Sequence, residues 1–424
     1  MREDFLSYIW LNKLIDVNNL KTVKGVPIKI INSGSLNTDA GPDIFNAKLS
    51  IGDLVWAGNI EIHVLASDWY KHKHQNDPNY NSIILHLVYD YDTEIVTNDG
   101  RIVACLPLKG KFDMRLFRKF AQLKRSTNWI PCEKSIDKVS ELTWINCKDK
   151  MLVERLERKA KFVEELYHKK QQNWEETFYC LLAKTMGMKT NALAFEMLFD
   201  TISFAQIRNN AHSLFQVDTL LFGQSGMLHN PIDHLYHELL RDEYNDLNFS
   251  LQLRPMDVNL WKFHRMRPAN FPTVRLAQLA YILSEKPDFF ERVISYQLDI
   301  NDFLEDVSHS NFWAQHYTFE DEPKPKMKFL GQTTIDHIVI NCITPFLFYY
   351  GKQNHKPDFV DSALDYLQEI KSEKNSIIHK WKGLSVNCES AFDSQALIQL
   401  KNEYCDKYKC LRCVVGNEII RHHE

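Results

Sequence analysis

The sequence predicts an α/β domain at the N-terminus followed by a large, mainly α-helical domain. Residues 22–108 alternate apolar with polar side chains, are rich in Val and Ile, and are interrupted by Gly-containing turns, a pattern typical of β-strands. From about residue 112 the apolar side chains recur instead with the 3.6-residue period of amphipathic helices. We therefore expect two domains, over residues 1–125 and 135–424.

Local signals place the elements in order along the chain. An amphipathic helix is expected over residues 3–15, ahead of the strands, and a long helix over residues 142–170 opens the helical region. Asn173 and Glu176 then form an N-x-x-E capping signal for the next helix, and Gly187 suits its end. The remaining periodic segments predict helices at 191–202, 231–241, 272–285, 334–350, 358–371 and 390–405.

The composition indicates a globular protein without a membrane segment. With 44% hydrophobic and 25% charged residues, the chain is ordinary for a soluble protein of 424 residues. Its net charge of −4 does not indicate a nucleic-acid partner, so such binding would depend on local patches. No apolar run reaches the ~20 residues of a membrane span, and the N-terminus lacks the features of an export signal. We interpret the nine cysteines as reduced thiols of a cytoplasmic protein.

Two carboxylates and an imidazole are predicted to meet on neighbouring strands. Glu61 and His63 point to one face of their strand, the solvated one, because side chains alternate with period 2. Asp43 opens the preceding strand, and a hairpin turning at Gly52-Asp53 would bring it close to Glu61. Two carboxylates at one point suit a hard cation such as Mg²⁺. The alternative is a polar strand whose acids pair with nearby lysines.

Histidines are concentrated in the segment after Glu61. His72 and His74 follow within a short predicted helix, and His86 lies inside the next apolar strand. His72 and His74 are candidate metal ligands, and His86 is a candidate catalytic group or, taken alone, a hydrogen-bonded core histidine.

The motifs Pro42-Asp43 and Glu61-Ile62-His63 resemble those of the PD-(D/E)XK nucleases, in which an Asp and an acid-x-Lys hold Mg²⁺ and activate water. The resemblance implies a restriction-endonuclease-like mixed sheet, Mg²⁺ or Mn²⁺ at Asp43 and Glu61, and a nuclease or phosphodiesterase acting on nucleic acid. His63 stands where Lys is usual, and a neutral imidazole can accept a proton near pH 7. The catalytic residues would be Asp43, Glu61, His63 and His86. The alternative is a catalytically degenerate module that binds nucleic acid or protein.

Two basic stretches are candidate nucleic-acid contacts. Residues 109–125 carry seven Lys or Arg against a single Asp. Further along, Arg265, Arg267 and Arg275 alternate with aromatic residues near Asn270, and Arg binds phosphate while aromatic rings stack on bases. The alternative for both stretches is a solvated basic face, or arginines paired with acids elsewhere in the fold.

The C-terminal region contains three closely spaced cysteines. Cys405, Cys410 and Cys413 have the knuckle-like spacing of a zinc or iron–sulfur site. Some PD-(D/E)XK nucleases hold this region with an iron–sulfur cluster bound by three such cysteines and one remote cysteine, which the tail resembles. The fourth ligand stays open among Cys388, His422 and His423. The alternative is a small buried cap in which Cys is an ordinary apolar residue.

Nearly the whole chain resembles one uncharacterised bacterial family, domain of unknown function 2851. The segments that carry the resemblance include NSGSLNTDAGPDIFNAKL, WAGNIEIHVLASDWYKHKHQNDPNYNSIILHLVYDYD, LLFGQSGML, RMRPANFPTVRLAQLA and YCDKYKCLRC. This resemblance implies a family without an established activity, so the function has to be argued from the residues themselves.

Overall fold

The chain folds into two compact units. The computed structural model describes residues 1–37, 39–295, 299–323 and 329–421. The first unit comprises residues 1–147 together with 400–424, and the second comprises residues 148–399. This division differs from the expected one, because the C-terminal segment packs with the N-terminal elements rather than with the helices that precede it.

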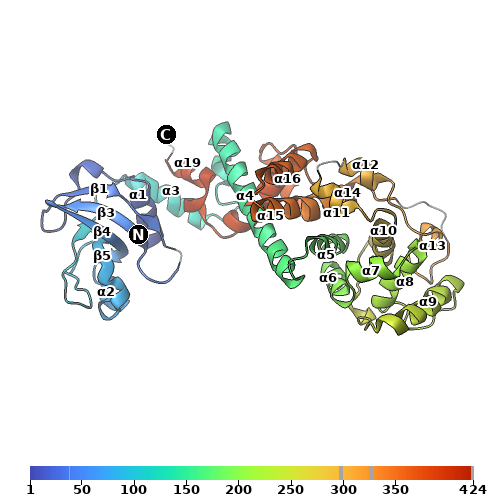
Figure 1. Cartoon of the computed structure of the whole chain (residues 1–424). Helices are drawn as coiled ribbons and strands as arrows, with labels where there is room; N and C mark the ends of the chain where they lie inside the picture. The colour runs from blue at the N-terminus through green and yellow to red at the C-terminus, as the bar shows by residue number, and fades with distance from the viewer. Residues whose placement is uncertain (38, 296–298, 324–328, 422–424) are drawn as a thin grey trace. The chain divides into compact units, whose positions relative to one another are not determined.

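A mixed β-sheet forms the centre of the first unit (Figure 1). Its strands are β1 (Ile28–Asn32), β2 (Ser35–Leu36), β3 (Ile44–Ile51), β4 (Leu54–Leu65), β5 (Ile83–Asp90) and β6 (Cys105–Pro107). The order is β1-β3-β4-β5-β6, with β2 also paired to β3. The first part of the sheet is antiparallel, whereas β5 runs parallel to both β4 and β6. The prediction of an N-terminal mixed sheet followed by a helical region is confirmed.

The β3–β4 hairpin turns where the sequence predicts, at Gly52, whose φ of +60° favours glycine. Ile60 and Ile62 of β4 enter the core. Glu61 and His63 share the opposite face of the strand, but they are only 4% and 1% exposed. The expectation that this face is solvated is therefore wrong, since the chain between β4 and β5 folds over it.

Short helices surround this face of the sheet. α1 (Glu3–Leu11) packs against β4, and α2 (Asp68–Lys71) follows that strand directly. Two 3₁₀ helices, His74–Asn76 and Pro78–Ser82, complete the connection to β5. This connection supplies His72 and His74, so its path decides how the histidines meet Glu61.

The rest of the first unit consists of helices that follow the sheet and helices of the C-terminal segment. After the sheet come α3 (Met114–Arg125) and the 3₁₀ helix Glu133–Lys138, and the chain ends in the 3₁₀ helix Cys410–Arg412 and α19 (Val414–Arg421). α19 contacts both earlier helices. The side chain of Glu418 on α19 accepts hydrogen bonds from the backbone N–H and the hydroxyl of Ser140, at 2.9 and 3.0 Å.

The second unit is helical in the residues described. α4 (Glu141–Lys169) crosses the boundary, and the following helix begins at the predicted cap, where the Asn173 side chain accepts the Glu176 N–H at 3.1 Å. The helices that follow are α5 (Trp174–Met186), α6 (Ala192–Thr201), α7 (Phe204–Asn210), α8 (Leu214–Gln224), α9 (Leu235–Leu251), α10 (Pro272–Glu285), α11 (Phe289–Ile294), α12 (Ile300–Glu305), α13 (Asn311–Gln315), α14 (Gln332–Ile338), α15 (Thr344–Gln353), α16 (Pro357–Glu369), α17 (Ser376–Gly383) and α18 (Ala391–Gln399).

Two π-helical segments continue these helices. One, Val339–Ile343, joins α14 to α15, and the other, Leu400–Cys405, extends α18 into the first unit. Within the described ranges, no helix combines the length and the apolar character needed to cross a membrane.

Candidate metal centre

The two predicted carboxylates hold each other in place. The Ile62 N–H donates to Asp43 Oδ2 at 3.0 Å, and the Asp43 N–H donates to Glu61 Oε2 at 3.2 Å. This reciprocal arrangement follows from the hairpin, because Ile44 at the start of β3 pairs with Ile60 of β4. One oxygen of each carboxylate is therefore fixed by the backbone, and its other oxygen remains to bind a ligand.

Three imidazoles form a line beside these acids. His63 Nδ1 lies 2.8 Å from His86 Nε2, and His63 Nε2 lies 3.0 Å from His72 Nδ1. A neutral imidazole donates at one ring nitrogen and accepts at the other, so neutral histidines can satisfy both contacts. Burial lowers the pKa of His63 to about 2 and that of His86 to about 3, with further lowering by the neighbouring histidines. The line runs from buried His86 to exposed His72.

His74 reaches the carboxylates from the connecting segment. Its Nε2 lies 3.2 Å from Glu61 Oε1, and its ring stacks on Tyr80 with 3.9 Å between ring centroids. The Nε2 atom is nevertheless buried without an aligned hydrogen bond to any described residue. The donor nitrogens of His63, His72 and His74 lie within 4.8 Å of one another. An unsatisfied buried nitrogen next to a carboxylate fits a metal ligand.

The electrostatics of the acids also fit a cation. Burial raises the pKa of Asp43 to about 7, with the charge of Glu61 as the next cause, and burial raises the pKa of Glu61 to about 8. Two carboxylates this close resist ionising together. A divalent cation would supply the positive charge that both need, and the mixed oxygen and nitrogen donors suit Mn²⁺ better than Mg²⁺, which prefers oxygen.

The sequence did not point to three residues of this site. Glu3, at the start of α1, lies close enough for its charge to raise the pKa values of Asp43 and Glu61. Trp69 and Tyr80 pack against His74, with ring centroids 5.3 and 3.9 Å away. Glu3 carries no local signal, since it lies about forty residues before Asp43. Trp69 and Tyr80 are aromatic residues of a connecting segment, and from sequence such residues are interpreted as part of the hydrophobic core.

The predicted cysteine group is brought together with cysteines that the sequence did not suggest. Cys405, Cys410 and Cys413 are buried in the first unit, and burial raises the pKa of the Cys132 thiol, with Cys413 and Cys410 adding to the effect. The proposed partner Cys388 belongs to the second unit. The alternatives His422 and His423 lie outside the described residues.

The predicted nucleic-acid contacts of the second unit divide into two kinds. Arg265 and Arg267 are exposed. Arg275 is only 4% exposed, and its guanidinium donates to the side chains of Gln278, Asn270 and Thr334. Arg275 and Asn270 therefore brace the start of α10 and present no open guanidinium to phosphate.

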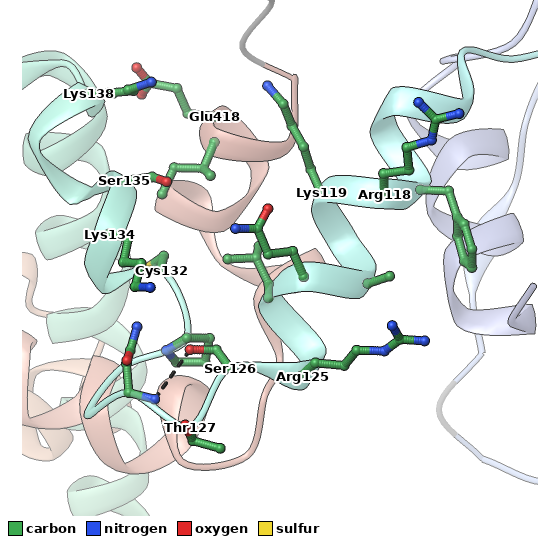
Figure 2. A pocket seen from close by; sticks show the side chains of 17 residues that line it. Arg118, Lys119, Arg125, Ser126, Thr127, Cys132, Lys134, Ser135, Lys138 and Glu418 are labelled. Carbon is green, nitrogen blue, oxygen red and sulfur yellow. Dashed lines mark hydrogen bonds between the residues drawn. The ribbon is translucent and has the colours of Figure 1, made fainter.

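The other predicted basic stretch lines a pocket of about 910 Å³ in the first unit (Figure 2). α3 forms one side with Arg118, Lys119 and Arg125, and the chain carrying Lys134 and Lys138 forms the other. The acidic residue of the lining is Glu418, which Ser140 already engages. The pocket therefore carries five cationic side chains against one carboxylate, as expected of a site for a polyanion.

Comparison with known proteins identifies a family. Searches of the curated proteins and of the solved structures found no match. The model of the family described as "Protein of unknown function (DUF2851)" matches residues 3–376, which include the carboxylates, the histidines and the basic stretch of α3. Since this match covers most of the sequence, the chain belongs to the DUF2851 family.

Proposed function

We propose that the first unit is a metal-dependent nuclease or phosphodiesterase that uses Mn²⁺ or Mg²⁺. The observation that carries the proposal is the reciprocal pair Asp43 and Glu61, each with an oxygen fixed by backbone N–H and with His74 Nε2 beside Glu61. Asp43 directly before β3 and Glu61 in β4 agree with the resemblance to PD-(D/E)XK nucleases. When bound, such a metal supplies a water of lowered pKa and stabilises negative charge on a phosphate.

The protein's own groups would position and deprotonate that water. Asp43, Glu61, His72 and His74 would hold the metal. Glu61 Oε1 lies 3.2 Å from His74 Nε2, and the donor nitrogens of His72 and His74 lie within 4.8 Å of each other. His63 is neutral at physiological pH, since burial lowers its pKa, and so it can accept a proton. The hydrogen bond between His63 Nε2 and His72 Nδ1 would orient His72 as a ligand, because it leaves His72 Nε2 for the metal.

The basic pocket supports nucleic acid as the substrate. It lies in the same unit as the carboxylates, and its cations would hold several phosphates of a backbone. Arg118 and Arg125 are exposed, and neither forms an ion pair with a described residue. A small phosphoester would not need so extended a positive surface.

The first test is metal binding, measured as the rise in melting temperature with Mn²⁺. A ligand at 100 times its Kd stabilises the folded state by about 2.7 kcal/mol, which is readily measured. We expect Asp43→Asn to abolish the rise and Asp53→Asn, at the exposed turn of the same hairpin, to retain it. An equal rise in all three proteins would refute the assignment of the ligands.

The second test is cleavage of single-stranded DNA, duplex DNA and RNA with Mn²⁺ or Mg²⁺. We expect metal-dependent cutting by the wild-type protein and none by Glu61→Gln. Cutting that survives in the variant would overturn the site. Mn²⁺ binding and salt-dependent nucleic-acid binding without cleavage of any substrate would favour the degenerate binding module instead.

A further inference from the structure

The basic pocket of the first unit carries cations on two facing walls (Figure 2). One wall is formed by α3, with Arg118, Lys119 and Arg125. The other wall is formed by the 3₁₀ helix that follows, with Lys134 and Lys138. All of these side chains except Lys119 are exposed to solvent. A ligand seated between the walls therefore meets positive charge from both sides, which suits a chain of several phosphates.

The stretch between the walls is uncharged and held in place. Residues 126–128 follow α3 and line the pocket, with Ser126 and Thr127 lying between the walls in Figure 2. The Asn128 N–H donates to the Ser126 hydroxyl at 3.3 Å, and the Tyr408 hydroxyl donates to the Ser126 carbonyl at 2.8 Å. The C-terminal segment therefore braces this stretch. Its hydroxyl and amide groups can hydrogen-bond sugars and base edges, which carry no charge.

The size of the pocket distinguishes a single strand from a duplex. A slice of duplex DNA one base pair thick, about 3.4 Å by about 20 Å across, fills roughly 1,000 Å³. The pocket, at about 910 Å³, is smaller than this slice. A duplex can therefore lie only across its mouth. Half of the slice, one nucleotide of a single strand, fills roughly 500 Å³, so the pocket accommodates about two nucleotides of one strand.

The pocket adjoins the helix that also packs beside the carboxylates. Phe117 of the pocket lining packs against Phe5 of α1, with 5.2 Å between the ring centroids. α1 in turn packs against β4, the strand that carries Glu61. From α19, which also lines the pocket, Arg421 donates to the Tyr8 hydroxyl of α1 at 3.2 Å. The pocket and the candidate metal centre are therefore neighbours of the same nine-residue helix.

We propose that the basic pocket binds single-stranded nucleic acid and thereby selects single strands over duplexes as the substrate. The proposal rests on the nuclease function proposed above and specifies its substrate. Phosphates of about two nucleotides would lie between the two walls, with sugars and bases against residues 126–128. The strand would then pass α1, and the phosphate to be cut would lie at Asp43 and Glu61. DNA and RNA strands share this chemistry, so the test includes both.

The test is fluorescence anisotropy of labelled oligonucleotides with the full-length protein. The probes are a DNA strand of about twelve nucleotides, the RNA strand of the same sequence and the blunt DNA duplex. A chelator is present throughout, so that neither a metal nor cleavage contributes to the signal. We expect a single strand to bind at least tenfold more tightly than the duplex. A flat basic surface would favour the duplex, because its charge density is higher.

Paired substitutions locate the binding site. Arg118→Gln combined with Lys134→Gln removes one cation from each wall and should weaken single-strand binding at least tenfold. The slope of log affinity against log salt should become shallower by about 0.7 for each lost phosphate contact. Lys29→Gln combined with Lys48→Gln removes two exposed lysines of β1 and β3 in the same unit, and this control should bind like the wild type.

Each result decides the proposal. Duplex binding as tight as single-strand binding overturns it, and so does an equal loss of affinity in the two double variants. A larger loss in Arg265→Gln combined with Arg267→Gln would place the strand on the second unit and also overturn it. Metal-dependent cleavage of duplex alone would support the nuclease function and overturn the choice of single strands. Selective single-strand binding without cleavage of any substrate would support the pocket and remove the nuclease function.

Discussion

Replacing Glu61 by Gln should stabilise the metal-free protein at alkaline pH, although it removes a proposed metal ligand. Burial raises the pKa of the Glu61 carboxyl from its ordinary value of 4.5 to about 8, and the charge of Glu3 adds to this. Between these two pH values the folded protein keeps a proton that the unfolded chain has released. The folded state therefore loses stability as the pH rises through this interval.

The size of the effect follows from the same pKa values. A tenfold difference in proton affinity corresponds to about 1.4 kcal/mol, so an interval from 4.5 to about 8 corresponds to at most about 5 kcal/mol. Gln cannot ionise, so the variant does not lose this free energy of unfolding as the pH rises. Its amide oxygen can still accept the Asp43 N–H, which lies 3.2 Å from Glu61 Oε2. The variant should match the wild type below about pH 4.5, exceed it increasingly as the pH rises to about 8, and keep a constant advantage above that pH.

Urea unfolding with a chelator present, between about pH 5 and pH 9, measures this difference. Glu369→Gln, at an exposed position, should follow the wild-type protein throughout. If the curves of Glu61→Gln and wild type stay parallel across this range, the carboxyl is not held in the buried environment described here. Without the chelator, added Mn²⁺ should reverse the expected order of stability, because it should stabilise the wild type and not the variant.

Three further substitutions test the structure by urea unfolding at neutral pH. Arg275→Met should lower the free energy of unfolding by about 2–4 kcal/mol, because it leaves buried hydrogen-bond acceptors unpaired. The same change should leave DNA binding in a filter assay unchanged. Gly58→Ala should cost about 1–3 kcal/mol, since the added Cβ would lie 2.5 Å from the Ser82 carbonyl oxygen; an unchanged midpoint would contradict this packing. Asn173→Ala should lower the free energy of unfolding by about 1 kcal/mol, because the Glu176 N–H loses its capping acceptor. Asn173→Asp should retain most of the wild-type stability, since its carboxylate can accept the same N–H.

The parts of the site that sequence reasoning could predict are those encoded over short distances. The period of 2 along β4 puts Glu61 and His63 on one face, and the turn at Gly52 brings Asp43 beside them. The long helix α4 and the cap at Asn173 follow equally from local signals. In each case the residues that determine the feature lie within about twenty positions of one another.

The remaining features depend on contacts between distant segments. Whether the Glu61 face is wet or buried depends on how the connection to β5 folds back, and alternation within β4 is the same in both cases. The approach of Glu3 and the meeting of Cys132 with Cys413 likewise require the whole unit to be assembled. Arg275 looks like a surface arginine in sequence, but α10 is buried almost all round, so its guanidinium is taken up by internal partners.

The first unit contains both ends of the described fold, and this has a consequence for biosynthesis. A ribosome releases residues 1–147 long before residues 400–424, so the N-terminal elements wait for most of the chain to be translated before their partners exist. During that interval the apolar surface later covered by α19 stays exposed to chaperones and proteases. A nascent chain stalled before residue 400 should therefore be degraded faster than its helical unit alone, and the first unit should complete its fold only after its C-terminal segment has left the ribosome.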